Sequence, residues 1–187
     1  YILLAEILRK ENNFSDAINA LHAAKKIEEF NSEIDYNLAI SYKTIKSFRE
    51  ALVFIDDAVK KQPENKIYKI LKADILIDCF QDEKAQELLC NLKFKKDSLL
   101  HFQSEILISK IFINQKNYKL AEETLLELKK IFSKQKILYL NLSDLYFKSK
   151  ELEKGISILQ EGIDHFPKFI PLRFNLGIMY RLSLIHI

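Results

Sequence analysis

The chain of 187 residues is 48% hydrophobic and 29% charged, and its three glycines and three prolines leave little turn chemistry for an all-β fold. This composition argues against disorder and predicts an all-α protein with a packed core. The net charge of +3 at pH 7 is mild and spread along the chain, and no apolar run is long enough to span a bilayer, so we expect neither a nucleic-acid partner nor membrane insertion.

A small residue recurs at a fixed interval along the chain. Ala17, Ala51 and Ala85 lie 34 residues apart, and Ala121 and Gly155 follow at intervals of 36 and 34. Such a period is typical of one supersecondary unit stacked on copies of itself. With this series placed at position 20 of each repeat, the chain forms a single array with approximate repeat bounds of 1–31, 32–65, 66–101, 102–135, 136–169 and a partial repeat at 170–187.

Two further series of small residues accompany the first. They are Ala5, Ala39, Ala73, Ser109, Ser143 and Gly177 at position 8, and Ala24, Ala58 and Gly162 at position 27. Small side chains recur where two helix backbones approach closely, so the pattern predicts interlocked antiparallel helices with all three glycines at close contacts. Pro63 and Pro167, both at position 32, are predicted to follow the ends of second helices.

These residues carry a resemblance to a known repeat family. The run Tyr36-Asn-Leu-Ala-Ile-Ser-Tyr42, followed by Ala51, Ile55, Ala58 and Pro63, resembles a tetratricopeptide repeat (TPR). The resemblance covers five repeats and half of a sixth. It implies an all-α, right-handed α-solenoid of helix–turn–helix units, whose first helices line a concave groove and whose second helices form the convex back.

Some residues depart from the repeat pattern. Lys72 replaces a large apolar residue at position 7, and Leu92 and Leu128 replace small ones at position 27. An insertion of two residues near Lys93–Asp97 predicts a longer loop. If the groove bends or opens anywhere, we expect it to do so at this loop.

The two ends of the chain and its two cysteines bear on its origin. The sequence begins inside a helical pattern without Met, and Ser183–Ile187 break the pattern, so we expect a fragment of a longer chain with a truncated or non-native tail.

Cys79 and Cys90 fit no disulfide framework and are predicted to be reduced thiols in a helical core. Reduced cysteines and the absence of an apolar span favour a cytoplasmic location.

The resemblance places positions 2, 5, 6, 9, 12 and 13 of the first helices on the groove. Position 5 is apolar in every repeat, which either grips apolar side chains of a peptide or packs against the neighbouring helix, the commoner use of such a stripe. Asparagine at position 6 of three repeats can hold a peptide backbone, and this series resembles the asparagine ladder of O-linked glycosyltransferases. Alternatively, the asparagines reflect the general repeat consensus. The candidate groove residues are Tyr36, Asn37, Ile40, Lys43, Ile70, Asp74, Ile106, Lys110, Leu140, Asn141, Asp144, Phe174 and Asn175.

The charged residues predict no single ligand charge and no catalysis. Groove charges alternate in sign, which argues against a uniformly charged ligand. Lysine pairs are expected near the ends of the second helices, where they favour the negative end of the macrodipole, with a basic ridge as the alternative; they are Lys25-Lys26, Lys60-Lys61, Lys95-Lys96 and Lys129-Lys130. The four histidines form no cluster at ligand spacing, so we expect no metal, no cofactor and no catalytic residue.

The leading hypothesis is therefore a non-enzymatic scaffold that binds a protein or peptide partner in the groove. The alternative is a substrate-docking arm of a larger enzyme, of glycosyltransferase or sulfotransferase type, whose catalytic domain lies outside this sequence. An RNA-binding helical-repeat protein is the third hypothesis, disfavoured by the small net charge.

Overall fold

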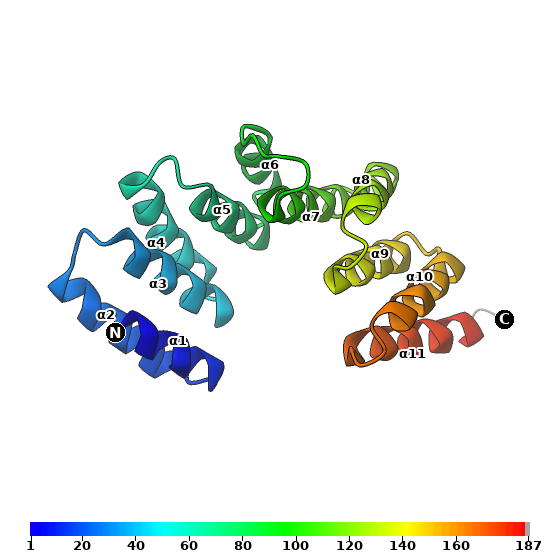
Figure 1. Cartoon of the computed structure of the whole chain (residues 1–187), viewed down its shortest axis with the longest axis horizontal. Helices are drawn as coiled ribbons and strands as arrows, with labels where there is room; N and C mark the ends of the chain where they lie inside the picture. Colours follow the sequence, from blue (N-terminus) through cyan, green and yellow to red (C-terminus); the bar gives the residue numbers. More distant parts are fainter. Residues whose placement is uncertain (186–187) are drawn as a thin grey trace. The chain divides into compact units, whose positions relative to one another are not determined.

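The computed structural model describes residues 1–185 (Figure 1). Over these residues the chain forms eleven helices and no strand. The helices are α1 (Ile2–Lys10), α2 (Phe14–Ile27), α3 (Ser32–Thr44), α4 (Phe48–Lys61), α5 (Lys66–Asp78), α6 (Asp82–Cys90), α7 (Leu99–Asn114), α8 (Tyr118–Ile131), α9 (Lys136–Lys148), α10 (Leu152–His165) and α11 (Ile170–Ile185). None of them is long and apolar enough to cross a membrane.

The chain divides into two compact halves, Tyr1–Lys93 and Phe94–Ile187. Within each half, every helix packs against the next in chain order. The first helices of successive repeats also touch directly, α1 with α3 and α3 with α5 in the first half, and α7 with α9 and α9 with α11 in the second. This is the stacked helix-pair arrangement that the repeat period predicts.

The turn inside each helix pair has one recurring backbone conformation. The residue at position 15 is left-handed in all five turns, with φ between 59° and 65°, although none is glycine. The next N–H then bonds back to the carbonyl at position 11, as from Ser47 to Tyr42 at 2.9 Å and from Gln81 to Leu76 at 2.9 Å. This Schellman-type bond ends the first helix and aims the chain into the second.

Small residues sit where the helices approach most closely. The alanines at positions 8 and 20 are fully buried. A Cβ added to Gly162 would lie 3.0 Å from the Cβ of Tyr139, and one added to Gly155 would lie 2.4 Å from the Sδ of Met179. The prediction of close packing is confirmed for these two glycines.

Gly177 is different. It is exposed, and an added Cβ would have no atom within 4 Å, so the prediction of close packing is wrong there. Position 8 faces the second helix of its own repeat, and within residues 1–185 no helix follows α11.

The insertion produces the long loop that was expected. Helix α6 ends at Cys90 after nine residues, whereas α2, α4, α8 and α10 each have 14. Lys95-Lys96 therefore lie in the loop and not near a helix end, which corrects that prediction. The prediction of two core cysteines is also wrong, because Cys79 caps α5 and is only partly buried, while Cys90 is exposed at the early end of α6.

Lysines at helix ends make specific contacts. Lys25-Lys26, Lys60-Lys61 and Lys129-Lys130 occupy the last turns of α2, α4 and α8, as predicted. Lys25 and Lys61 reach the fully buried carboxylate of Asp35 on α3, at 2.6 and 2.5 Å. Lys129 pairs with Glu161 on α10. Lys25, Lys61 and Lys129 therefore tie helices together, whereas Lys26, Lys60 and Lys130 are exposed.

Three other sequence features can be compared with the helices. Lys72, the departure at position 7, pairs with Asp56 on α4 at 2.7 Å, so an ion pair replaces the usual apolar contact. Ser183–Ile185 continue α11, and His186 and Ile187, the rest of the tail predicted to be non-native, lie outside the described residues. Pro63 and Pro167 directly follow the C-cap residues of α4 and α10, as predicted.

Candidate functional site

The candidate groove residues fall on one face of the first helices, here called the first-helix face. In the first half, α3 and α5 carry Tyr36, Asn37, Ile40, Lys43, Ile70 and Asp74. In the second half, α7, α9 and α11 carry Ile106, Lys110, Leu140, Asn141, Asp144, Phe174 and Asn175. The two sets belong to different halves, so each is described within its own half.

The apolar residues at position 5 serve mainly as packing. Ile70 is buried, and the Tyr36 ring stacks on Tyr68 at 4.9 Å between centroids. Ile106 and Leu140 pack against the core of the second half. Phe174 alone in this group is largely exposed, at 68%. The packing interpretation therefore suits most of the stripe, and Phe174 is the member open to a ligand.

The asparagines at position 6 already hold internal hydrogen bonds. The Asn37 amide donates to the Glu33 carbonyl at 2.8 Å and its oxygen accepts from Arg9 at 2.9 Å, and the residue is buried. Asn141 donates to the Ile137 carbonyl at 2.8 Å. Asn175 donates across to the Ser143 hydroxyl at 3.5 Å. Only Asn141 and Asn175 remain partly open to solvent.

In the first half, charges close the space between α3 and α5. Lys43, at position 12 of α3, lies 3.0 Å from both Asp74 and Asp78, at positions 9 and 13 of α5. Burial by itself lowers the pKa of Lys43, but the two carboxylates outweigh it and raise that pKa above its ordinary value. A ligand would have to break this cluster to enter here.

In the second half, the same three positions are apolar. Position 12 of α9 is Phe147, and positions 9 and 13 of α11 are Ile178 and Leu182. The Phe147 side chain is 43% exposed and borders two hollows. The smaller hollow has a volume of about 150 Å³ and is lined by Ser143, Asp144, Phe147, Asn175, Ile178 and Met179.

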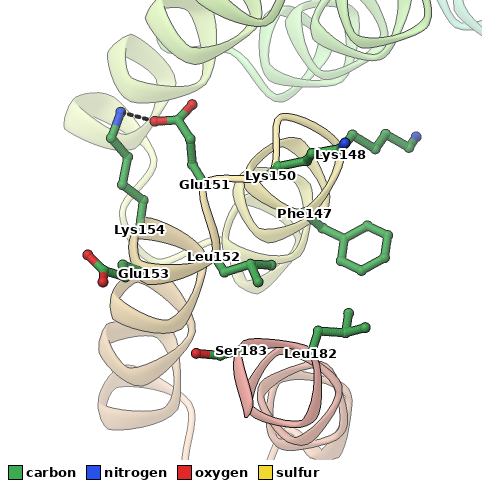
Figure 2. Close-up of a pocket in the computed structure, with 9 residues that line it drawn as sticks. All are labelled: Phe147, Lys148, Lys150, Glu151, Leu152, Glu153, Lys154, Leu182 and Ser183. Atoms are coloured by element: carbon green, nitrogen blue, oxygen red, sulfur yellow. Dashed lines mark ion pairs between the residues drawn. The ribbon is translucent and has the colours of Figure 1, made fainter. Parts of the chain in front are cut away.

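The larger hollow is open and more polar, with a volume of about 1020 Å³. Its lining is drawn in Figure 2 and consists of Phe147, Lys148, Lys150, Glu151, Leu152, Glu153, Lys154, Leu182 and Ser183. Figure 2 shows the Phe147 ring and the Leu182 side chain facing a common space between α9 and α11, with the Glu151–Lys154 ion pair away from it. The two hollows meet at Phe147, and together they form what we call the α9–α11 groove.

One wall of this groove is held by a polar network. The Tyr146 hydroxyl donates to Glu122 on α8 at 2.9 Å, and Lys154 on α10 bonds the same carboxylate at 3.1 Å. Burial and the hydrogen bond to Glu122 raise the pKa of Tyr146 to about 12. The network joins α8, α9 and α10, so α9 presents Phe147 from a fixed support.

The rim of the groove carries both signs of charge. Asp144 and Lys148 pair at 3.0 Å along α9, with side chains 50% and 43% exposed. An exposed pair at this spacing is worth about 0.3–0.5 kcal/mol, so a ligand can displace it easily. Asp144 and Asn175 are the candidate residues that the structure brings to this site.

Sequence reasoning missed Phe147, Ile178, Met179 and Leu182. The detectable signal was the change from lysine to phenylalanine at position 12 between α3 and α9, together with the change from aspartate to isoleucine and leucine at positions 9 and 13 between α5 and α11. Among the described residues no group of histidine, cysteine and carboxylate side chains is placed to hold a metal ion. The chemistry that the site offers is the binding of apolar and hydrogen-bonding groups.

Comparison with known proteins establishes the fold. The TPR protein TTC0263 from Thermus thermophilus superposes with a TM-score of 0.80 at 14% identity over 96% of both chains. The TPR protein YrrB, described with an unusual peptide-binding site, gives 0.61 at 16% identity over 93% of this chain and 89% of its own. The human IFIT1 dimer with PPP-AAAA gives 0.68 at 18% identity over 93% of this chain and 43% of IFIT1.

The chain therefore has the tetratricopeptide-repeat fold, an all-α solenoid of helix pairs, and the resemblance seen in the sequence is confirmed. No protein-family model and no curated protein matches the sequence. At these identities the likeness concerns the fold, so the function rests on the site itself.

Proposed function

We propose that this protein is a non-enzymatic scaffold that binds a peptide or protein partner on its first-helix face, with the α9–α11 groove as the main contact. The observation that carries the proposal is the open apolar space around Phe147, at positions where the first half has a closed ion cluster. YrrB, of the same fold, is described with a peptide-binding site, which supports this class of ligand.

The physical gain comes from covering apolar surface. A partner side chain against Phe147 and Ile178 removes apolar area from water, at about 25 cal/mol per Å². Asn175 lies beside this surface and is partly exposed, so its side-chain oxygen offers an acceptor to a peptide backbone. Apolar contact with a few convergent polar groups is the usual composition of a binding pocket.

A display library of random short peptides, selected on the immobilised chain, tests the proposal. We expect selected peptides to bind the wild type and to lose about tenfold or more in affinity to a Phe147→Ala variant, because one buried aromatic anchor commonly carries that much. Phe80→Ala is the matched control, since Phe80 is 93% exposed, lies on the α5–α6 turn and belongs to the other half of the chain.

Two results would contradict the proposal. One is a library that yields no binder. The other is a set of binders whose affinity is unchanged by Phe147→Ala and by substitutions elsewhere on the first-helix face, for example at Phe174 or Lys43.

The alternative is that the same face docks the substrate of a larger enzyme of glycosyltransferase or sulfotransferase type. Its support is the partly exposed pair Asn141 and Asn175 on the adjacent helices α9 and α11. Backbone recognition predicts selected peptides without a side-chain consensus, whose binding falls in an Asn141→Ala/Asn175→Ala variant. A clear side-chain consensus would favour the scaffold.

A further inference from the structure

We infer that the notch between α9 and α11 is an anchor pocket for one uncharged apolar side chain of the partner, of leucine, methionine or phenylalanine size. The notch is defined by Phe147, Ile178 and Leu182: Phe147 and Ile178 line the smaller hollow, and Phe147 and Leu182 line the larger one. This inference rests on the proposed function and specifies the ligand chemistry of that site.

The internal comparison between the two halves carries the inference. Position 12 of one first helix faces positions 9 and 13 of the next, as the contacts of Lys43 with Asp74 and Asp78 demonstrate. In the second half this register brings together Phe147, Ile178 and Leu182. The notch between α3 and α5 is therefore filled by its own ion pairs, whereas the corresponding notch between α9 and α11 is open and apolar.

The size of the smaller hollow matches one side chain. Its volume is about 150 Å³, and an apolar cavity of about 150 Å³ accepts a benzene-sized group. Met179 forms its floor and is 3% exposed. Methionine adapts its shape to irregular apolar neighbours, so the floor can fit either an aliphatic or an aromatic group.

The rim sets the charge preference. Asp144 and Lys148 are already paired across its edge, so the rim offers no net charge to a ligand. A charged side chain in the notch would lose water against Phe147, Ile178 and Met179, which is costly. The partner that it could gain on the exposed rim, Asp144 or Lys148, contributes only about 0.3–0.5 kcal/mol. The pocket therefore selects an uncharged apolar residue, while the partly exposed Asn175 is available to the peptide backbone beside it.

The chain supplies its own reporter for a direct test. Met179 is its single methionine, so a protein labelled with carbon-13 at the methionine methyl gives one signal, from a residue that lines the smaller hollow and whose methyl packs against Gly155 on α10. We expect titration with N-acetyl-L-leucinamide or N-acetyl-L-phenylalaninamide to shift this signal saturably in the millimolar range, which is usual for ligands with so few atoms. N-acetylglycinamide, which lacks the side chain, should leave the signal in place.

A transplanted notch provides the matched variant. Phe147→Lys/Ile178→Asp/Leu182→Asp copies the closed cluster of α3 and α5 into the second half, and it should abolish the saturable shift. The reciprocal Lys43→Phe/Asp74→Ile/Asp78→Leu variant should bind a second equivalent of a library-selected peptide, measured by calorimetry. Circular dichroism establishes that each variant is folded, and the wild-type titration decides the question even if one variant is not.

The outcomes separate this inference from the proposed function. No saturable shift with either apolar probe, or the same shift in the transplanted variant, would overturn the anchor pocket. Library peptides that bind the transplanted variant as well as the wild type would also overturn it, while leaving peptide binding in place. A saturable shift with the apolar probes, but no library peptide that binds, would support the anchor pocket and contradict peptide binding.

Discussion

At the scale of single residues, small side chains decide how closely these helices pack. Gly155 and Gly162 face side chains of α9 and α11 at distances that leave little or no room for a Cβ. Gly177 occupies the equivalent of a buried alanine position and faces open space. The same residue type therefore has opposite energetic roles within one repeat array.

Alanine at two of these glycines should change stability in opposite directions. Gly177→Ala should raise the free energy of unfolding by about 0.5–1 kcal/mol, because alanine favours the helix and meets no neighbour. Gly162→Ala should lower it by about 1 kcal/mol, because overpacking against Tyr139 and Leu172 outweighs the helix gain. Urea unfolding of both variants measures the difference, and equal effects would show that the packing argument is wrong.

The buried carboxylate of Asp35 is the second residue-scale feature with a measurable effect. Asp35→Asn should lower the free energy of unfolding by about 2–3 kcal/mol. Breaking a fully buried pair costs about 3–5 kcal/mol, and the partly exposed lysines reduce that loss. Asp144→Asn, in an exposed pair, is the control and should cost about 0.5 kcal/mol or less. Similar losses in the two variants would refute the assignment.

Much of this residue-scale picture follows from the sequence alone. The buried alanines and the close contacts of Gly155 and Gly162 are predicted by the repeat register, because position in a repeat sets the neighbour. The exposure of Cys90 is not predicted by the register, because it depends on where α6 ends. The exposure of Gly177 is not predicted either, because within residues 1–185 no helix follows α11 to cover it. The pairing of Lys72 with Asp56 needs the orientation of two helices, which spacing does not provide.

At the scale of elements, the turn inside each pair stores a small strain. Asn12, Lys46, Phe80, Lys116 and Lys150 all adopt the left-handed conformation. Three are lysine, one is asparagine and one is phenylalanine, none of them a type that requires this conformation, so it could not be read from composition. It follows from the Schellman-type bond that every repeat needs in order to reverse the chain.

Relief of this strain is testable at Phe80, whose side chain is almost fully exposed. Phe80→Gly should raise the free energy of unfolding by about 0.5–1 kcal/mol, the left-handed penalty of about 1–2 kcal/mol less the greater unfolded-state entropy of glycine. Phe80→Ala removes the same ring and keeps the penalty, so it should give no gain. A gain of equal size in both variants would point to the exposed ring and not to the backbone.

At the scale of the whole molecule, the chain consists of two compact halves joined at a loop. The boundary falls between Lys93 and Phe94, inside the segment lengthened by the two-residue insertion. The sequence located this longer loop, since the interval from Ala85 to Ala121 is 36 residues. The open notch between α9 and α11 was not predicted, because repeat position alone does not show whether the side chains of two neighbouring helices pair with each other or leave a space.

Limited proteolysis should identify the same boundary. Trypsin is expected to cut first after Lys93, Lys95 or Lys96, because exposed loop lysines reach a protease more readily than helical ones. Lys25-Lys26 and Lys60-Lys61 lie in helices and serve as internal controls. Mass spectrometry of the first fragments reads out the result, and an initial cut within α2 or α4 would contradict this assignment.

The contrast between Lys43 on α3 and Phe147 on α9 also has a consequence for how the protein responds to its solvent. Added salt screens the attraction between Lys43 and its two aspartates, whereas strongly excluded salts such as sulfate favour burial of the surface around Phe147. Ionic conditions therefore act in opposite directions on two sites of identical register. The second notch should hold its apolar ligand best under the conditions that loosen the first.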